Sequence, residues 1–359
     1  MNDRPARALI DLAALRHNHA LACRRHGGRV LAVLKANAYG HGALRCAQAL
    51  ADQADGFAVA FLAEALALRA GGIRAPILVL EGAFSMRELE AAHAHDLWTV
   101  VHHADQLRMI EQAPAAVRDL VVWLKVDSGM RRAGFLPHAV RDAHARLAAS
   151  GKLARLTLMS HFASADEPDA ALTREQVTAF DAATAGLPGE RSLSNSAGVL
   201  AWPEANSDWA RTGILLYGAN PVRGDASELR PVMHLQSEVF AERTLEPGDV
   251  LGYGASFAAA RKTRVGLVAM GYADGYPRSA PTGTPAAVGG RLTRTLGRVS
   301  MDMMTVDLSD LPGEGVGSPV ELWGTQVPVD TVARQAGTIA YELLCNVKRV
   351  PLVYDEARR

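Results

Sequence analysis

The sequence predicts an α/β protein in which a (β/α)8 barrel of the TIM type precedes a mainly β C-terminal domain. The chain of 359 residues exceeds the length at which one hydrophobic core usually stops growing. Short apolar, β-branched runs alternate with longer alanine-rich segments of helical period up to about residue 217. Later runs of Val, Leu and Thr are short and separated by Gly and Pro. We therefore expect a barrel at residues 1–230 and a β domain at residues 231–359.

The expected elements follow from these runs. Barrel strands are predicted at 30–34, 57–60, 77–80, 98–101, 120–126, 155–160, 192–194 and 213–217, of which 192–194 has the weakest pattern. Helices are predicted between them at 42–52, 62–70, 86–95, 104–112 and 174–185, and in the β domain at 329–336 and 339–346. In such a barrel the catalytic groups lie in loops that follow the strands, so these loops are where we expect a site.

The composition of the chain excludes several classes of protein and of binding partner. The 38 Lys and Arg residues balance the 38 Asp and Glu residues, and no block of like charge stands out, which argues against a nucleic-acid partner. The cysteines Cys23, Cys46 and Cys345 are too few and too scattered for a disulfide framework. No signal peptide and no apolar run long enough for a bilayer stands out. We expect a cytoplasmic protein with no membrane partner and no metal.

The first candidate group is Lys35, where the predicted strand 30–34 runs into a turn punctuated by glycine. By position alone, a lysine that extends along a strand end to reach water is the commoner case. A partly desolvated lysine at a barrel mouth is also a candidate to form a Schiff base with a carbonyl cofactor.

The segment KANAYGHG at residues 35–42 resembles, along its whole length, the pyridoxal-phosphate attachment signature of alanine racemases. The resemblance implies that pyridoxal 5'-phosphate is attached to Lys35 and that Tyr39 donates a hydrogen bond to its phosphate. The two glycines of the segment fit a backbone that approaches a ligand closely.

A second segment, LKVDSGMRR at residues 124–132, read alone is a charged loop. It resembles the family segment in which the position of Arg132 binds near the substrate carboxylate. The resemblance also implies that Lys125 lies where a lysine is often carbamylated, and a carbamate would pair with the guanidinium. Arg131 stands where we expect Gly or Asn, so the assignment of Arg132 rests on its spacing from Lys125.

Two further segments of the barrel resemble family motifs that surround the cofactor ring. HFASAD at residues 161–166 is similar to a motif that places His161 beside the ring, although a histidine after a strand is about as often an ordinary loop residue. RTGI at residues 211–214 resembles the motif whose arginine, here Arg211, faces the pyridine nitrogen. An arginine cannot transfer a proton as a carboxylic acid does, so the ring would be a weaker electron sink, which favours simple proton exchange.

The phosphate site is expected after the seventh and eighth strands, where barrels commonly use backbone amides and a hydroxyl. An Asn-Ser turn alone is a weak signal. The resemblance implies that Ser196, Gly213 and Ile214 hold the phosphate, with Asn195 in the same turn, and that Tyr341 touches the phosphate and restricts substrate size. Segment 192–194 lacks a histidine that some relatives have.

The β domain carries GYGAS at residues 252–256, GYADGY at 271–276 and GRVSMD at 297–302. Each is a weak signal alone, but in this order they resemble the racemase C-terminal domain. The resemblance implies that Tyr253 is the second base and that Tyr272 and Met301 contact the substrate carboxylate.

We therefore expect a racemase that interconverts L-alanine and D-alanine with Lys35 and Tyr253 on opposite faces of the cofactor. A free tyrosine titrates near ~10, and the resemblance supplies a chain from Tyr253 through His161 to Arg211 that would activate it. In this family the tyrosine comes from the partner subunit, which implies a homodimer with shared sites. The activity would serve peptidoglycan synthesis or D-alanine catabolism.

Several alternatives compete with this interpretation. A racemase of serine or of a broader set of amino acids is the nearest, and Tyr341 favours alanine. A non-catalytic pyridoxal-phosphate-binding protein would be a barrel alone, and a related decarboxylase would place a carboxylate where Arg211 stands. A metal enzyme would have to use histidines that form no motif, namely His93, His95, His102 and His103.

Overall fold

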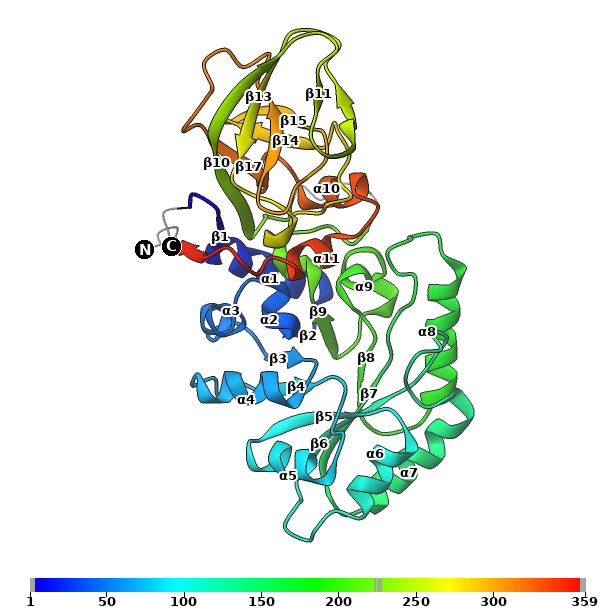
Figure 1. The fold of residues 1–359 in the computed structure, drawn as a ribbon. Helices are drawn as coiled ribbons and strands as arrows, with labels where there is room; N and C mark the ends of the chain where they lie inside the picture. The colour runs from blue at the N-terminus through cyan, green and yellow to red at the C-terminus, as the bar shows by residue number, and fades with distance from the viewer. Residues whose placement is uncertain (1–3, 223, 225–227, 356–359) are drawn as a thin grey trace.

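The computed structural model describes residues 4–222, 224 and 228–355 and contains the predicted barrel (Figure 1). All neighbouring strands of its eight-stranded sheet are parallel, and their order is β8-β7-β6-β5-β4-β3-β2-β9. The strands are β2 Arg29–Val33, β3 Gly56–Val59, β4 Ile77–Val79, β5 Leu97–Val101, β6 Leu120–Lys125, β7 Leu153–Met159, β8 Glu190–Ser192 and β9 Trp209–Thr212.

The sheet nearly closes on itself between β8 and β9. The backbone amide of Arg211 donates to the carbonyl of Ser194 at 2.9 Å, and the hydroxyl of Ser192 donates to the carbonyl of Trp209 at 2.9 Å. These bonds bring the loops after the last two strands together. Strands β2 to β6 are largely apolar runs because a parallel barrel is buried on both faces, whereas β8 and β9 also carry polar side chains.

Helices surround the barrel, and several have clear end signals. Helix α1 begins after Asp11, whose carboxylate accepts from the amide of Ala14 at 2.8 Å, and it ends at Gly27, whose φ is +79°. The sequence did not predict α1, α7 or α9, and it predicted a turn where the short α2 stands. The helices are α1 Leu12–His26, α2 Lys35–Tyr39, α3 Ala43–Leu50, α4 Leu62–Ala70, α5 Met86–Ala94, α6 Ala104–Glu111, α7 Val140–Ala149, α8 Ala171–Thr184 and α9 Ser196–Ala201. No helix in the described part of the chain is long and apolar enough to span a membrane.

The second unit is mainly β, as predicted, and its strand pairings run from β10 through β17, β14, β15, β16 and β13 back to β10. Its strands are β10 Met233–Leu245, β11 Val250–Leu251, β12 Phe257–Ala258, β13 Thr263–Val268, β14 Pro285–Val288, β15 Arg291–Leu296, β16 Met304–Asp307, β17 Pro319–Trp323 and β18 Leu352–Asp355. Its helices are α10 Val329–Gln335 and α11 Ala340–Cys345.

Strand β1 Arg7–Asp11 also belongs to the second sheet, where it lies between antiparallel β10 and parallel β18. In Figure 1 it lies at the junction of the two units. The division at residues 230 and 231 stays a prediction. The predicted division assigns β1 to the barrel, although β1 pairs with strands of the second sheet. The partners of β1 lie more than 200 residues away along the chain, so the local sequence gives no sign of where β1 pairs.

The predicted eighth strand at 213–217 is wrong. The strand is β9, which ends at Thr212, and residues Ile214–Tyr217 form the 3-10 helix η3. Gly213 separates them with φ −115° and ψ −90°. The side chains of η3 are buried like those of a core strand, so its apolar run gives no periodicity by which to distinguish helix from strand.

Candidate active site

The segment after β2 forms a left-handed turn. Ala36, Asn37 and Ala38 have φ between 53° and 55° and ψ between 47° and 50°, and Tyr39 has φ 51°. L-residues pay roughly 1–2 kcal/mol each in this conformation, and such strain tends to occur at functional sites. Gly40 continues with φ +83°, where an added Cβ would lie 2.3 Å from the carbonyl oxygen of Leu344 in α11.

This turn places Lys35 at its start, half-buried at the barrel mouth, and Tyr39 at its end. Tyr39 is 6% exposed, and its ring stacks on Tyr217 at 4.9 Å and lies 5.9 Å from the ring of Tyr341. Burial raises the pKa of Tyr39, so its hydroxyl keeps its proton and is available as a donor.

The hydroxyls of Tyr39 and Ser196 converge on Gly213. A Cβ added at Gly213 would lie 2.4 Å from Oη of Tyr39. The Ser196 hydroxyl accepts from the amides of Gly213 at 2.8 Å and Leu215 at 3.3 Å. Asn195 caps the same turn by accepting from the amide of Gly198 at 2.9 Å. Two hydroxyls and a row of amides, which includes that of Ile214 at the start of η3, form the kind of pocket that binds a phosphate.

Arg211 is 4% exposed and is held by neutral oxygens. Its Nη1 donates to the carbonyl of Ser192 at 3.0 Å and to the hydroxyl of Ser192 at 2.5 Å. Its Nη2 donates to the carbonyls of Ser160 at 2.5 Å and Leu193 at 3.4 Å. Burial lowers the pKa of Arg211 to about 10, so the guanidinium stays charged at neutral pH without a carboxylate among these acceptors.

His161 follows β7 and lies among positive charges. Burial is the main reason that its pKa lies well below the ordinary value of 6.5. The cations that lower this pKa further are Arg211, Lys125, Arg132 and Lys35. His161 is therefore neutral near pH 7, and the structure brings together five of the residues that the sequence predicted for this site.

Lys125 ends β6 and is buried. Burial and the charges of Arg211, Arg132 and Lys35 lower its pKa from 10.5 to about 8, against the opposing charge of Glu81. A substantial fraction of this amine is neutral at slightly alkaline pH and is able to act as a nucleophile.

Arg132 lies in the loop after β6 and is exposed. Asp127 shapes this loop by accepting from the amides of Gly129 at 3.0 Å and Arg131 at 2.9 Å. Arg131 has φ +56°, the left-handed conformation that the Gly or Asn expected at its position adopts readily.

Three predicted residues of the second unit, Tyr253, Tyr272 and Met301, do not join this cluster within one chain, unlike Tyr341. Tyr253 is 67% exposed in the 3-10 helix η4 Tyr253–Ala255, which follows β11 in the second unit. Tyr272 and Met301 lie together, since Ala273 donates its amide to the carbonyl of Met301 at 3.0 Å, and both side chains are exposed. Among the described residues, no hydrogen bond or ring contact joins these three side chains to Lys35.

Two residues of the site were missed by sequence reasoning, namely Ser160 and Ser192. Both are fully buried and supply the acceptors of Arg211. Their position directly at the ends of predicted barrel strands was the only feature of the sequence that could have marked them as site residues, but serine at a strand end is too common to stand out.

Exposed aromatic side chains also lie at the barrel mouth. Phe61 follows β3 and Phe84 follows β4, and their rings lie 6.1 Å apart. Both are more than half exposed, at 51% and 66%. A pair of large exposed aromatic rings beside a site is typical of a surface that another chain covers.

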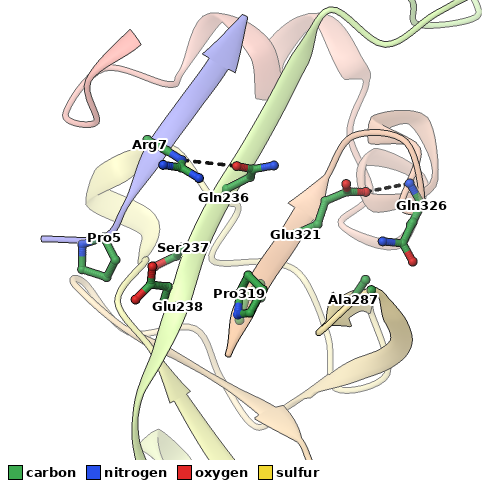
Figure 2. A pocket seen from close by; sticks show the side chains of 11 residues that line it. Pro5, Arg7, Gln236, Ser237, Glu238, Ala287, Pro319, Glu321 and Gln326 are labelled. Carbon is green, nitrogen blue, oxygen red and sulfur yellow. Dashed lines mark hydrogen bonds between the residues drawn. The ribbon is translucent and has the colours of Figure 1, made fainter. Parts of the chain in front are cut away.

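A separate pocket of about 260 Å³ lies on the second sheet, between β1, β10, β14 and β17 (Figure 2). In it Arg7 donates to Gln236 at 3.3 Å, and Glu321 accepts from the amide of Gln326 at 2.7 Å. None of the predicted site residues lines it.

The histidines of the metal alternative do not assemble. His93 is on α5, His95 follows it, and His102 and His103 lie between β5 and α6 with their rings 4.9 Å apart. The described part of the chain contains no group of three or more His, Cys, Asp or Glu side chains that could hold a metal ion.

Comparisons with known proteins cover nearly the whole chain. The family model "Alanine racemase, N-terminal domain" matches residues 10–221, and "Alanine racemase, C-terminal domain" matches residues 232–354. An alanine racemase of Azoarcus sp. is 66% identical over 98% of this chain and 99% of its own. A catabolic alanine racemase of Pseudomonas aeruginosa is 59% identical over 99% of this chain and 100% of its own.

Solved structures agree with these matches. The biosynthetic alanine racemase from Pseudomonas aeruginosa superposes with a TM-score of 0.95 and 49% identity, and covers 98% of this chain and 100% of its own. The alanine racemase from Bartonella henselae with covalently bound pyridoxal phosphate superposes with a TM-score of 0.89 and 27% identity, and covers 98% of this chain and 99% of its own.

Proposed function

The chain belongs to the alanine racemase family, and on that premise we propose that Lys35 and Tyr253 exchange the α-proton of alanine on two faces of one shared active site. The reaction interconverts L-alanine and D-alanine and is an isomerisation. The observation that carries the assignment of residues is the set of cations around His161, namely Arg211, Lys125, Arg132 and Lys35, because so many positive charges fit an anionic cofactor and a carboxylate substrate. Arg211 among them is buried and held only by neutral oxygens.

The residues of the barrel mouth fit pyridoxal phosphate. The space that a Cβ of Gly213 would fill is bordered by the hydroxyl of Tyr39, and Ser196 already accepts from two amides there. When bound, pyridoxal phosphate supplies an electron-withdrawing ring that makes the α-proton of an amino acid acidic. We propose that it is attached through the Lys35 amine and held by Tyr39, His161, Asn195, Ser196, Arg211, Gly213, Ile214 and Tyr341.

Arg211 determines how strongly charge is drawn toward the ring nitrogen. Its guanidinium keeps its proton near pH 7, since its pKa is about 10. It therefore donates a hydrogen bond without transferring a proton. A site built in this way returns a proton to the substrate carbon quickly, which suits racemisation.

Two bases are required because the α-proton leaves from one face and returns on the other. Lys35 Nζ removes or returns it on one face, and Tyr253 Oη of the partner subunit acts on the opposite face. Neutral His161 is able to accept a hydrogen bond from that tyrosine, and its position among cations favours the tyrosinate.

The exposure of the groups involved supports a homodimer. Tyr253 and Met301 are 67% and 53% exposed in one chain, and Phe61 and Phe84 are exposed at the barrel mouth. We propose that the second unit of each subunit covers the barrel mouth of the other, so that both apolar surfaces are buried together.

Arg132, Tyr272 and Met301 bind the substrate carboxylate in this proposal, and Lys125 orients Arg132. The neutral amine of Lys125 attacks carbon dioxide, forms the N–C bond of a carbamate and releases one proton. The side chain then carries a negative charge that pairs with the guanidinium of Arg132. The pKa of Lys125 near 8 supports this step, because only the unprotonated amine reacts.

Tyr341 lies against Tyr39 and limits the space for the substrate side chain. We therefore propose alanine as the main substrate, with serine or a broader set of amino acids as the alternative. Chiral separation of products from alanine, L-serine and L-lysine tests this. Fast turnover of alanine alone supports the proposal, and bound cofactor with no racemisation would identify a pyridoxal-phosphate-binding protein.

Mixed dimers test the shared site. Lys35→Ala removes one base and the point of attachment, and Tyr253→Phe removes the other base, so each variant alone should be inactive from L- to D-alanine. After unfolding and refolding together in equal amounts, random pairing restores about a quarter of the wild-type activity, since half of the dimers contain one site with both residues. No recovery on mixing would contradict the proposal that Tyr253 acts across the interface.

The pathway is proposed from relatives alone. A catabolic alanine racemase of Pseudomonas aeruginosa is more similar in sequence than the biosynthetic structure from that organism. We therefore propose D-alanine catabolism over supply for peptidoglycan. Transcript levels that rise when alanine is the carbon source would support this, and constant levels would favour the biosynthetic role.

A further inference from the structure

Ser160 contacts two parts of the site that lie far apart in the sequence. Its backbone carbonyl accepts from Nη2 of Arg211 at 2.5 Å. Its hydroxyl donates to the carbonyl of Val126 at 2.9 Å and lies 2.7 Å from the hydroxyl of Ser128, which therefore donates to it. Ser160 is fully buried, so water does not compete for these bonds.

Val126 and Ser128 begin the loop that carries Arg132. The base of this loop is closed by Asp127 and Phe135, because the amide of Asp127 donates to the carbonyl of Phe135 at 2.9 Å and the amide of Phe135 donates to the carbonyl of Lys125 at 2.8 Å. These bonds define the shape of the loop. They do not relate it to the last barrel strand, where Arg211 lies.

One link is the ladder bond from the amide of Val126 to the carbonyl of Met159 at 2.8 Å, and the two hydroxyl contacts of Ser160 add the side-chain links. We propose that Ser160 is a positioning residue that sets the place of the Arg132 loop relative to Arg211, so that the substrate carboxylate and the cofactor ring are held in register. This inference rests on the proposed roles of Arg132 and Arg211. Ser160 acts through the loop and Arg211 and has no contact role of its own in this inference.

Ser192 provides a matched control. It is also fully buried and follows the same pattern at the end of the neighbouring strand, where its hydroxyl accepts from Arg211 and donates to the carbonyl of Trp209. It makes no hydrogen bond to the loop at residues 126–135. Ser192→Ala therefore disturbs Arg211 without disturbing the loop directly.

The test compares the two variants as holoenzymes in kinetics and in backbone amide hydrogen exchange. Ser160→Ala keeps the carbonyl to Arg211 but removes both hydroxyl contacts of the loop. Its KM for alanine should rise about fivefold to tenfold with kcat within about twofold, because a buried carbonyl loses its donor and the loop is released. Exchange in residues 126–135 should become faster, whereas Ser192→Ala should leave exchange in that loop unchanged.

Ser128→Ala provides a second variant for the case in which Ser160→Ala does not fold. It removes one of the two contacts, and it should change KM and loop exchange in the same direction by a smaller factor. A loss of kcat at constant KM, or unchanged exchange in the loop of both variants, would overturn the inference and leave Ser160 a packing residue. Failure of the proposed function is seen separately, as a wild-type enzyme that does not racemise alanine.

Discussion

Gly213→Ala tests the geometry of the phosphate pocket. The added Cβ would lie 2.4 Å from Oη of Tyr39, so the hydroxyl has to move by about 1 Å to reach an ordinary contact distance of about 3.5 Å. Tyr39 is buried and packed against the rings of Tyr217 and Tyr341, which resist that movement. Overpacking of this kind should cost about 1–3 kcal/mol of the free energy of unfolding.

The assay is urea unfolding of the apoenzyme at one protein concentration, since an oligomer gains apparent stability with concentration. Tyr39→Phe in the same chain removes Oη and leaves Cζ, at 3.1 Å, as the nearest atom to the new methyl group. The double variant should therefore recover more than half of the stability lost by Gly213→Ala. Losses that add within about 0.5 kcal/mol would refute the contact, and an unchanged single variant would refute the geometry.

Three further predictions concern strain, pH and carbon dioxide. Ala36→Gly should raise the free energy of unfolding by about 0.5–1 kcal/mol, because the relief of a left-handed φ at an exposed position exceeds the entropy cost of glycine. Ala36→Val should lower the free energy of unfolding. If the urea midpoints of the two variants fall in the reverse order, the backbone at Ala36 is not strained. His161 has a folded-state pKa well below its unfolded value, so the unfolded chain takes up the proton first as pH falls. The contribution of His161 to stability is therefore lost below about pH 6.5. His161→Gln should reduce the slope of the free energy of unfolding against pH by up to about 1.4 kcal/mol per pH unit between pH 7 and 5, and parallel curves for the two proteins would disprove this. Removal of dissolved carbon dioxide at pH 8 should raise the KM for alanine severalfold, and added bicarbonate should restore the original KM. The restoration should be smaller at pH 6.5, because Lys125 is then protonated. Equal KM values with and without carbon dioxide would exclude a carbamate.

The barrel and the following β unit were predicted with most of their elements. Helix α4 has the predicted bounds, because its apolar residues repeat with a clear helical period between two strands. Strand β1 was missed because its partners, β10 and β18, lie at the other end of the chain. The last barrel strand was predicted at the residues that form η3 instead of at β9, because both segments are buried.

In the candidate site, too, some residues were predictable from the sequence and others were not. Lys35 and Tyr39 are recognisable from a continuous motif, since a turn that approaches a ligand needs particular residues at adjacent positions. Arg131 departs from that kind of pattern, yet its backbone adopts φ +56°, the conformation that Gly or Asn adopts readily, while Asp127 accepts from its amide. The serines that hold Arg211 have no such local signature.

The sequence by itself determined which residues are available for the chemistry, because a motif such as 35–42 carries its own turn, its own glycines and its own lysine. Only the tertiary structure decided the charge and the surroundings of these groups. The pKa of Lys125 falls to about 8 because burial and the charges of Arg211, Arg132 and Lys35 act on it through space. Likewise, Tyr253 lies exposed and apart from Lys35 within one chain, because the distance between two units depends on how they pack and leaves no trace in either motif.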